Sequence, residues 1–229
     1  WWILLGIAGG LGMQTKYTMG VFVISALIYF VISGQWRIFL NGRLWGAGIL
    51  AFLIWLPNLI WNYYNDFITF QHTYEISEGN QKLFRWDEFG GFVGGQFGVF
   101  GIISFALLIY VTFKARFAHK KLLLTFAWTF VVIISLQALF GRANANWAAP
   151  AFVSASIAVA VWLVNFKHPK WLIAALSLNL VMAAGVYYFN PIVDALGIEK
   201  TSRNDIYKRL RGWPEIGQQF SAIRQQYPE

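Results

Sequence analysis

All ten acidic residues of this 229-residue chain lie in two windows, and long apolar runs occupy most of the remainder. The two windows contain Asp66, Glu75, Glu78, Asp87 and Glu88, and then Asp194, Glu199, Asp205, Glu215 and Glu229. A charged side chain is costly in hydrocarbon, so charges mark where a chain leaves a bilayer. The pattern therefore predicts a membrane protein whose apolar runs lie in the bilayer.

The composition agrees with this class. Hydrophobic residues make up 58% of the chain and charged residues 12%, with a mean hydropathy of +0.52, whereas a soluble domain has about 25% charged residues. The net charge of +8 is scattered over loops between apolar runs, so we read it as a topology signal and expect no nucleic-acid partner. The absence of Cys excludes disulfides and thiolate metal sites, and the three His residues have no zinc-protease spacing.

The apolar runs predict an all-α polytopic membrane protein with about seven transmembrane helices. The chain opens on Trp-Trp within an apolar run, so we expect a first helix that is cut short and a chain that begins partway into a longer protein. The predicted helices are Trp1–Met13, Thr18–Ser33, Leu44–Trp61, Phe89–Phe113, Leu122–Phe140, Ala148–Phe166 and Trp171–Phe189.

The sign of the loop charges predicts the orientation. Strict alternation places the loop with Arg37 and Arg43, the loop Lys114–Lys121 and the loop Lys167–Lys170 on one side. Basic loops favour the cytoplasm. The acidic loop Asn62–Glu88, the short loop Gly141–Trp147 and the C-terminus are then outside. We divide the chain into a transmembrane domain, residues 1–189, and the start of an extracytoplasmic soluble domain, residues 190–229, with an amphipathic helix expected in Tyr207–Tyr227.

The outer loop Asn62–Glu88 alternates apolar and charged residues, which predicts a short amphipathic helix on the membrane surface. Its His72, Glu75 and Arg85 are candidates for meeting a phosphorylated, sugar-bearing ligand. His72 is the strongest of the three because it can act as acid, base or donor. The alternative for each is a charge that only faces water.

Two cations have no acid near them in sequence. Lys16 is the only charged side chain in the first 36 residues, and Arg142 is alone in its outer loop. Either could bind a phosphate, for which a guanidinium offers bidentate geometry. The alternatives are a lysine that reaches the surface and an arginine that anchors a helix end at lipid headgroups.

A stripe of glycines runs through one predicted helix: Gly90, Gly91, Gly94, Gly95, Gly98 and Gly101. The favoured interpretation is close helix packing. The alternative is a groove that admits a lipid tail.

Four segments, taken in order, resemble one family. They are Gly10–Thr18, which holds a glycine-rich helix end and a Thr-Lys turn, the run Leu56–Asn62, the run Asn144–Phe152 with its Asn-Trp pair, and Arg209–Trp213. They are similar to segments of the bacterial dolichyl-phosphate-mannose–protein mannosyltransferase relatives, which include aminoarabinose transferases. The resemblance covers nearly the whole chain.

The resemblance implies a GT-C membrane glycosyltransferase of the bacterial inner membrane. Such an enzyme moves a sugar from a polyprenyl-phosphate donor to a glycan, lipid A-like or protein acceptor on the outer face, among membrane lipids. It implies donor-phosphate binding by Lys16, His72 and Arg142. Tyr17, Glu75, Arg85 and Asn146 are the candidate substrate-binding residues. No cofactor is evident, although a divalent metal is possible in GT-C enzymes.

One departure from the family limits this expectation. The family's catalytic acid lies in a first outer loop, which would fall upstream of Trp1, and neither Asp66 nor Glu75 matches it. We therefore expect these 229 residues to be inactive alone. Two other functions stay open: a transporter or flippase for a lipid-linked substrate, and a scaffold whose charges only fix topology.

Overall fold

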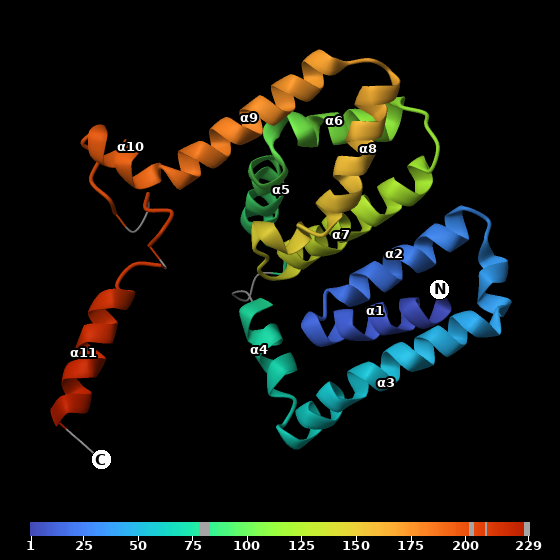
Figure 1. The fold of residues 1–229 in the computed structure, drawn as a ribbon, viewed down its shortest axis with the longest axis horizontal. Helices are drawn as coiled ribbons and strands as arrows, with labels where there is room; N and C mark the ends of the chain where they lie inside the picture. Colours follow the sequence, from blue (N-terminus) through green and yellow to red (C-terminus); the bar gives the residue numbers. More distant parts are fainter. Residues whose placement is uncertain (78–82, 202–203, 209, 227–229) are drawn as a thin grey trace. The chain divides into compact units, whose positions relative to one another are not determined.

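The computed structural model describes residues 1–77, 83–201, 204–208 and 210–226, and all regular elements in these ranges are helical (Figure 1). Glu78, Lys82, Arg209 and Glu229 lie outside the described residues. The α-helices are α1 (Trp2–Thr15), α2 (Met19–Ile32), α3 (Gly42–Tyr64), α4 (Ile68–Ser77), α5 (Trp86–Phe100), α6 (Ile102–Lys114), α7 (Lys120–Phe140), α8 (Ala151–Asn165), α9 (Pro169–Tyr187), α10 (Phe189–Ala195) and α11 (Trp213–Gln226). Two short 3-10 helices, η1 (Trp36–Leu40) and η2 (Ala145–Ala148), accompany them.

The chain divides into two compact units, Trp1–Asn179 and Leu180–Glu229, with the division inside α9. Most of the apolar helices belong to the first unit. The assignment of residues 190–229 to an outer soluble domain stays a prediction.

Glycines allow α1 to lie directly against α3. A Cβ atom added to Gly10 would lie 2.6 Å from Cβ of Ile54 and 2.7 Å from the carbonyl oxygen of Ala51. A Cβ atom added to Gly6 would lie 2.8 Å from the carbonyl oxygen of Ala47. The Gly-x-x-x-Gly spacing therefore works here as it does in other membrane helix pairs, by removing the side chains that would hold two backbones apart.

The buried core of this unit lies where α5 to α8 meet. Leu108 and Val111 of α6, Ala127 of α7 and Ala155 of α8 are fully buried there. The small side chains on α8 permit close packing against α7.

The predicted helix Phe89–Phe113 is wrong as a single straight helix. It is broken into α5 and α6, and the chain bends by 105° between them. Gly101 lies at the break with φ of +96°, and an added Cβ atom there would lie 1.9 Å from Oδ1 of Asn179. Only glycine fits, because a side chain would be strained by this backbone conformation and would collide with Asn179.

Close packing of the glycine stripe is also wrong for most of its members. Gly90, Gly91, Gly94 and Gly98 would meet nothing within 4 Å if they carried a Cβ atom, and all four are exposed. Gly95 is the exception, since its Cβ atom would lie 2.9 Å from Cβ of Ala145.

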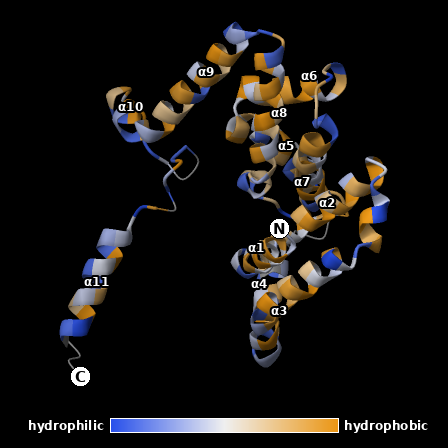
Figure 2. Cartoon of the chain, turned by 45° about the vertical axis from the view of Figure 1, so that its right-hand side comes forward, coloured by the Kyte–Doolittle hydropathy of each residue, from blue (hydrophilic) through white to orange (hydrophobic). Residues whose placement is uncertain are grey.

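The described residues contain three helices that are long and apolar enough to cross a membrane, α3, α7 and α9, or four if the bent pair α5–α6 is one span. The apolar helices α1, α2 and α8 have 14, 14 and 15 residues, fewer than the ~20 that a span needs. Figure 2 shows apolar residues along these helices, whereas α11 is mixed. The structure thus confirms a helical membrane protein, but by length it supports three or four spans and not seven.

A short helix in the expected outer loop is confirmed as α4, and its position on the membrane surface stays a prediction. The helix expected in Tyr207–Tyr227 begins later, at Trp213, with Pro214 in its first turn, where proline is tolerated.

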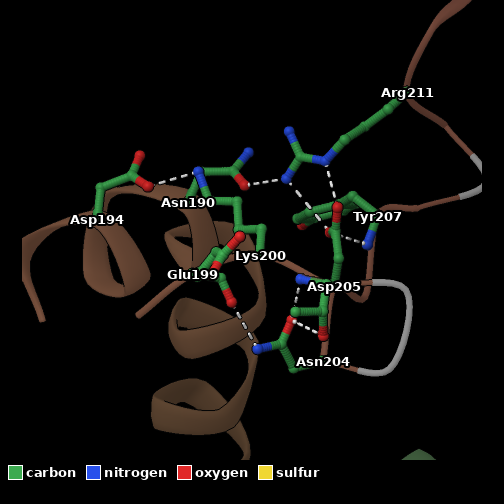
Figure 3. A network of polar contacts seen from close by, with 9 residues as sticks. Asn190, Asp194, Glu199, Lys200, Asn204, Asp205, Tyr207 and Arg211 are labelled. Carbon is green, nitrogen blue, oxygen red and sulfur yellow. Dashed lines mark hydrogen bonds and ion pairs between the residues drawn. The ribbon is translucent and has the colours of Figure 1, made fainter. Parts of the chain in front are cut away.

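In the second unit, polar contacts hold the loop between α10 and α11 (Figure 3). The Arg211 guanidinium bonds to the Asp205 carboxylate and donates to Oδ1 of Asn190 at 2.5 Å. The backbone N–H of Tyr207 donates to Oδ1 of Asp205 at 2.9 Å. The bond from Arg211 lowers the pKa of the Asp205 carboxyl, and the Tyr207 N–H contributes to the same effect.

Candidate functional site

A cavity of about 360 Å³ opens at the turn between α1 and α2. Its walls come from the end of α1, the following turn, α3, α4 and η2. The lining residues are Met13, Gln14, Thr15, Lys16, Tyr17, Thr18, Asn58, Thr69 and Trp147. Three of the four segments that carry the family resemblance therefore meet at one place.

A network of hydrogen bonds attaches the turn to α3. The Tyr17 hydroxyl donates to Oδ1 of Asn58 at 2.7 Å, and Nδ2 of Asn62 donates to the Tyr17 hydroxyl at 3.2 Å. Asn62 is fully buried. A buried amide that keeps its partners fixes their geometry, because leaving them unpaired is costly.

The same network reaches α4. The backbone N–H of Thr69 donates to Oδ1 of Asn62 at 3.3 Å. The ring of Tyr17 stacks on Phe70, with centroids 5.0 Å apart and planes at 16°, and meets Trp55 edge-on at 6.0 Å. Tyr17, one of the predicted substrate-binding residues, thus joins the turn between α1 and α2 to two helices, α3 and α4, while it lines the cavity.

Lys16 ends α1 in an extended conformation, with its backbone N–H bonded to the carbonyl oxygen of Gly12 at 3.0 Å. Its side chain is exposed and has no hydrogen bond or ion pair with any residue that the structure describes. The ammonium group at the cavity is therefore available to an anion.

The loop before Trp147 is held from α5. Nε2 of the fully buried Gln96 donates to the carbonyl oxygen of Ala145 at 3.2 Å. Nη1 of Arg85 donates to the carbonyl oxygen of Gly141 at 3.2 Å, and its Nη2 pairs with Glu88 at 2.9 Å. Arg85 is thus occupied by protein groups, in a position that fixes the loop carrying Arg142.

The remaining predicted site residues lie outside the lining of this cavity. Arg142, His72, Glu75 and Asn146 are exposed, and within the described part of the chain their side chains have no hydrogen bond or ion pair. Arg142 and Asn146 share the loop and 3-10 turn of Trp147, and His72 is on α4, one helical turn beyond Thr69. Their roles stay predictions.

The sequence reasoning did not select Asn58, Asn62 or Thr69 as site residues. A signal for the two asparagines was present, since they are amides four residues apart in an otherwise apolar run. Polar side chains inside a membrane helix commonly face other protein groups. Nothing comparable distinguishes Thr69.

No group of three His, Cys, Asp or Glu side chains that could hold a metal ion occurs among the residues that the structure describes.

Comparison with known proteins first gives the class. Residues 1–61 match the sequence profile of the dolichyl-phosphate-mannose–protein mannosyltransferase family. The matched part includes Lys16, Tyr17 and Asn58 of the cavity. The resemblance to this family is therefore confirmed.

An individual relative covers the rest of the chain. Over 235 aligned residues, the chain is 30% identical to the lipid A galacturonosyltransferase RgtD of Rhizobium johnstonii. The alignment covers 98% of this chain and 47% of that protein, so the chain spans about half the length of this curated relative. No solved structure matches the chain.

Proposed function

We propose that the whole protein is a glycosyltransferase that moves a sugar from a polyprenyl-phosphate donor to a lipid acceptor at the outer face of the bacterial inner membrane. A lipid A-like acceptor is favoured over a glycan or protein because the relative RgtD is named for lipid A. The observation that carries the proposal is Lys16, an unpaired cation at a cavity built by segments with the family resemblance.

The transfer reaction requires that negative charge on the donor phosphate be stabilised. Transfer breaks the bond between the sugar and the phosphate, and negative charge develops on the departing phosphate oxygen. In this proposal the Lys16 ammonium stabilises that charge without giving up a proton, as preorganised cations do in other transfer reactions. Tyr17 holds the turn that places Lys16, because its hydroxyl and ring are fixed by α3 and α4.

Arg142 and His72 would extend the donor site. Both are exposed and without partners among the described residues, and each is on a segment that also lines the cavity. A sugar phosphate is larger than one ammonium group can hold, so additional donors near the rim would orient it. Trp147 would offer an aromatic face to the lipid or the sugar.

The base that activates the acceptor is not among the residues assigned to this cavity. The described residues that line the cavity include no Asp or Glu. The acceptor hydroxyl must lose a proton as it attacks, so this role is not assigned to a cavity residue. No metal enters the proposal. Neither comparison favours the transporter alternative.

The test is sugar transfer by the full-length protein from a defined polyprenyl-phosphate donor. Lys16→Ala is expected to lower kcat/KM by roughly 100- to 1,000-fold, the usual effect of removing one donor to a developing oxyanion. Arg142→Ala should lower it less, because its side chain does not line the cavity. Lys170→Ala, on a loop predicted to lie on the opposite membrane side, is the matched control and should transfer normally.

Unchanged transfer in both Lys16→Ala and Arg142→Ala would remove the phosphate-binding assignment. Absence of transfer by the parent protein with every polyprenyl-phosphate sugar would instead contradict the donor class.

A further inference from the structure

A second cavity, of about 620 Å³, lies between α2 and α7 and is called the α2–α7 groove below. The two helices run antiparallel (Figure 1), and Phe22 and Phe126 are in ring contact with centroids 4.8 Å apart. The α2 wall is made by Ile28 and Ile32. These residues belong to the last turns of α2, whereas Lys16 and Thr18 lie just before its first residue, so the two cavities are at opposite ends of this helix.

The α7 wall is one helix face. Lys121, Thr125, Thr129 and Val132 recur every three or four residues and bring successive turns of α7 to the groove. Apart from the lysines at one end, the polar groups of this wall are two threonine hydroxyls and the indole N–H of Trp128. The Thr125 hydroxyl donates to the carbonyl oxygen of Lys121 at 2.7 Å, and the Trp128 N–H donates to the Thr112 hydroxyl at 2.8 Å. The groove thus accepts an apolar occupant along its length and a charged one at its lysine end.

The length of the groove matches one leaflet. From Lys121 to Ile133 is twelve residues along α7, about 18 Å at 1.5 Å per residue. Half of a hydrocarbon core of about 30 Å is about 15 Å. An acyl chain whose headgroup lies at Lys121 would therefore follow the groove to about the middle of the bilayer.

The lysine end continues into a third cavity, of about 530 Å³. Lys120 lines both cavities, and Lys114 and Arg116 line the third. The Nζ atom of Lys120 donates to the carbonyl oxygen of Ala115 at 2.6 Å, which holds this cation in place. Four cations therefore surround one end of an apolar groove.

These cations have no acidic partner in the described residues. The ion pairs there are Arg85–Glu88, Lys200–Asp194 and Arg211–Asp205, and none includes the cluster. Uncompensated cations beside the end of a membrane helix attract anionic headgroups.

We propose that the α2–α7 groove binds one anionic phospholipid, with an acyl chain against Ile28, Thr129 and Val132 and the phosphate at Lys120 and Lys121. This lipid is not the sugar donor, because the site lies at the other end of α2 from Lys16. The inference is independent of the proposed function.

The test is lipid retention by the full-length protein, purified in detergent and measured by native mass spectrometry with phosphatidylglycerol or phosphatidylcholine. Phosphatidylglycerol should be retained preferentially. The double variant K120Q/K121Q should weaken its retention roughly 10- to 30-fold, given the usual contribution of two lysines near an anionic surface. The matched control R43Q/K170Q removes two cations of the same predicted membrane face that line neither cavity, and should retain lipid normally.

A second pair of variants tests the apolar wall without touching the lysines. Val132→Trp fills the groove and should reduce retention. Val153→Trp adds the same bulk at a residue of α8 that is 69% exposed and lines neither cavity, and should have no effect. Glycerol phosphate in excess should not displace the lipid, because it lacks the acyl chain.

Equal retention of the two lipids, or normal retention in K120Q/K121Q, would overturn the proposal. Complete displacement by glycerol phosphate would also overturn it, since the site would then bind small anions and not a lipid.

Discussion

At the scale of single residues, the amide of Asn62 determines how the candidate site is assembled. It is fully buried and bonds to Tyr17, to Asn58 and to the backbone of Thr69. Asn62→Leu should lower the free energy of unfolding by about 1–3 kcal/mol, because it removes the hydrogen bonds of the buried amide to the Tyr17 hydroxyl and to the backbone N–H of Thr69. Thermal unfolding of the purified protein measures this.

The matched control is Asn65→Leu. Asn65 is exposed, and its Nδ2 atom donates to the carbonyl oxygen of Trp61 at 2.8 Å. Its replacement should change stability by less than about 0.5 kcal/mol, as surface substitutions do. Equal losses in the two variants would mean that the buried network contributes nothing specific.

Asp205 is a second single residue with a testable effect, because its ionisation makes the stability of the loop between α10 and α11 depend on pH. Its folded-state pKa is lowered by Arg211, so its contribution to stability is present above its unfolded pKa of about 3.9 and is lost as pH falls through the folded value. Asp205→Asn should therefore increase hydrogen exchange in the loop between α10 and α11 at pH 7, relative to the parent. This difference should shrink progressively below about pH 4.

The control for this prediction is Asp194→Asn. The Asp194 side chain is 62% exposed in its pair with Lys200, and such pairs contribute little. A difference between parent and Asp205→Asn that stays constant down to pH 2 would contradict the role of the carboxylate.

At the scale of helices, backbone contact between α1 and α3 gives opposite predictions for two glycines. Gly10→Ala would bring a Cβ atom within 2.6 Å of Ile54, and overpacking of this kind costs about 1–3 kcal/mol. Gly20 of α2 has nothing within 4 Å, so Gly20→Ala should be neutral or stabilise by up to about 1 kcal/mol through helix propensity. Thermal unfolding compares them directly, and a loss of stability in both would show that packing at Gly10 is not the cause.

The helices also show what composition and periodicity can predict. Apolar runs located the helical segments, because burial in a bilayer requires them. The break at Gly101 was missed. Asn179, which is 78 residues away, donates hydrogen bonds to Phe100 and Ser104 on either side of the break, and no local pattern reports such a contact. For the same reason, the glycine stripe of α5 suggested close packing that the structure shows in α5 only at Gly95, while Gly6 and Gly10 of α1 pack closely against α3.

At the scale of the whole molecule, the candidate site combines residues distant in sequence. Charge reasoning selected Lys16 as an unpaired cation, and the resemblance selected three of the segments that meet there. The tertiary contacts of Asn62 and Thr69 could not be derived, because they depend on how α3 and α4 fold back onto the turn. The cavity is lined by the turn at Lys16, by α4 and by η2 at Trp147, so these three segments lie together, and the side of the membrane on which they lie stays a prediction.

That orientation can be tested because these 229 residues contain no cysteine. Asn144→Cys and Ala118→Cys each introduce one thiol at an exposed loop position, in full-length protein from which any other cysteine has been removed. The positive-inside rule places Ala118, beside Arg116 and Lys120, in the cytoplasm and Asn144 outside. A membrane-impermeant maleimide applied to spheroplasts should therefore label Asn144→Cys alone, and permeabilised cells should label both. Labelling of Ala118→Cys alone in intact spheroplasts would invert the orientation and move the candidate donor site to the cytoplasmic face, where the proposed outer-face transfer could not occur.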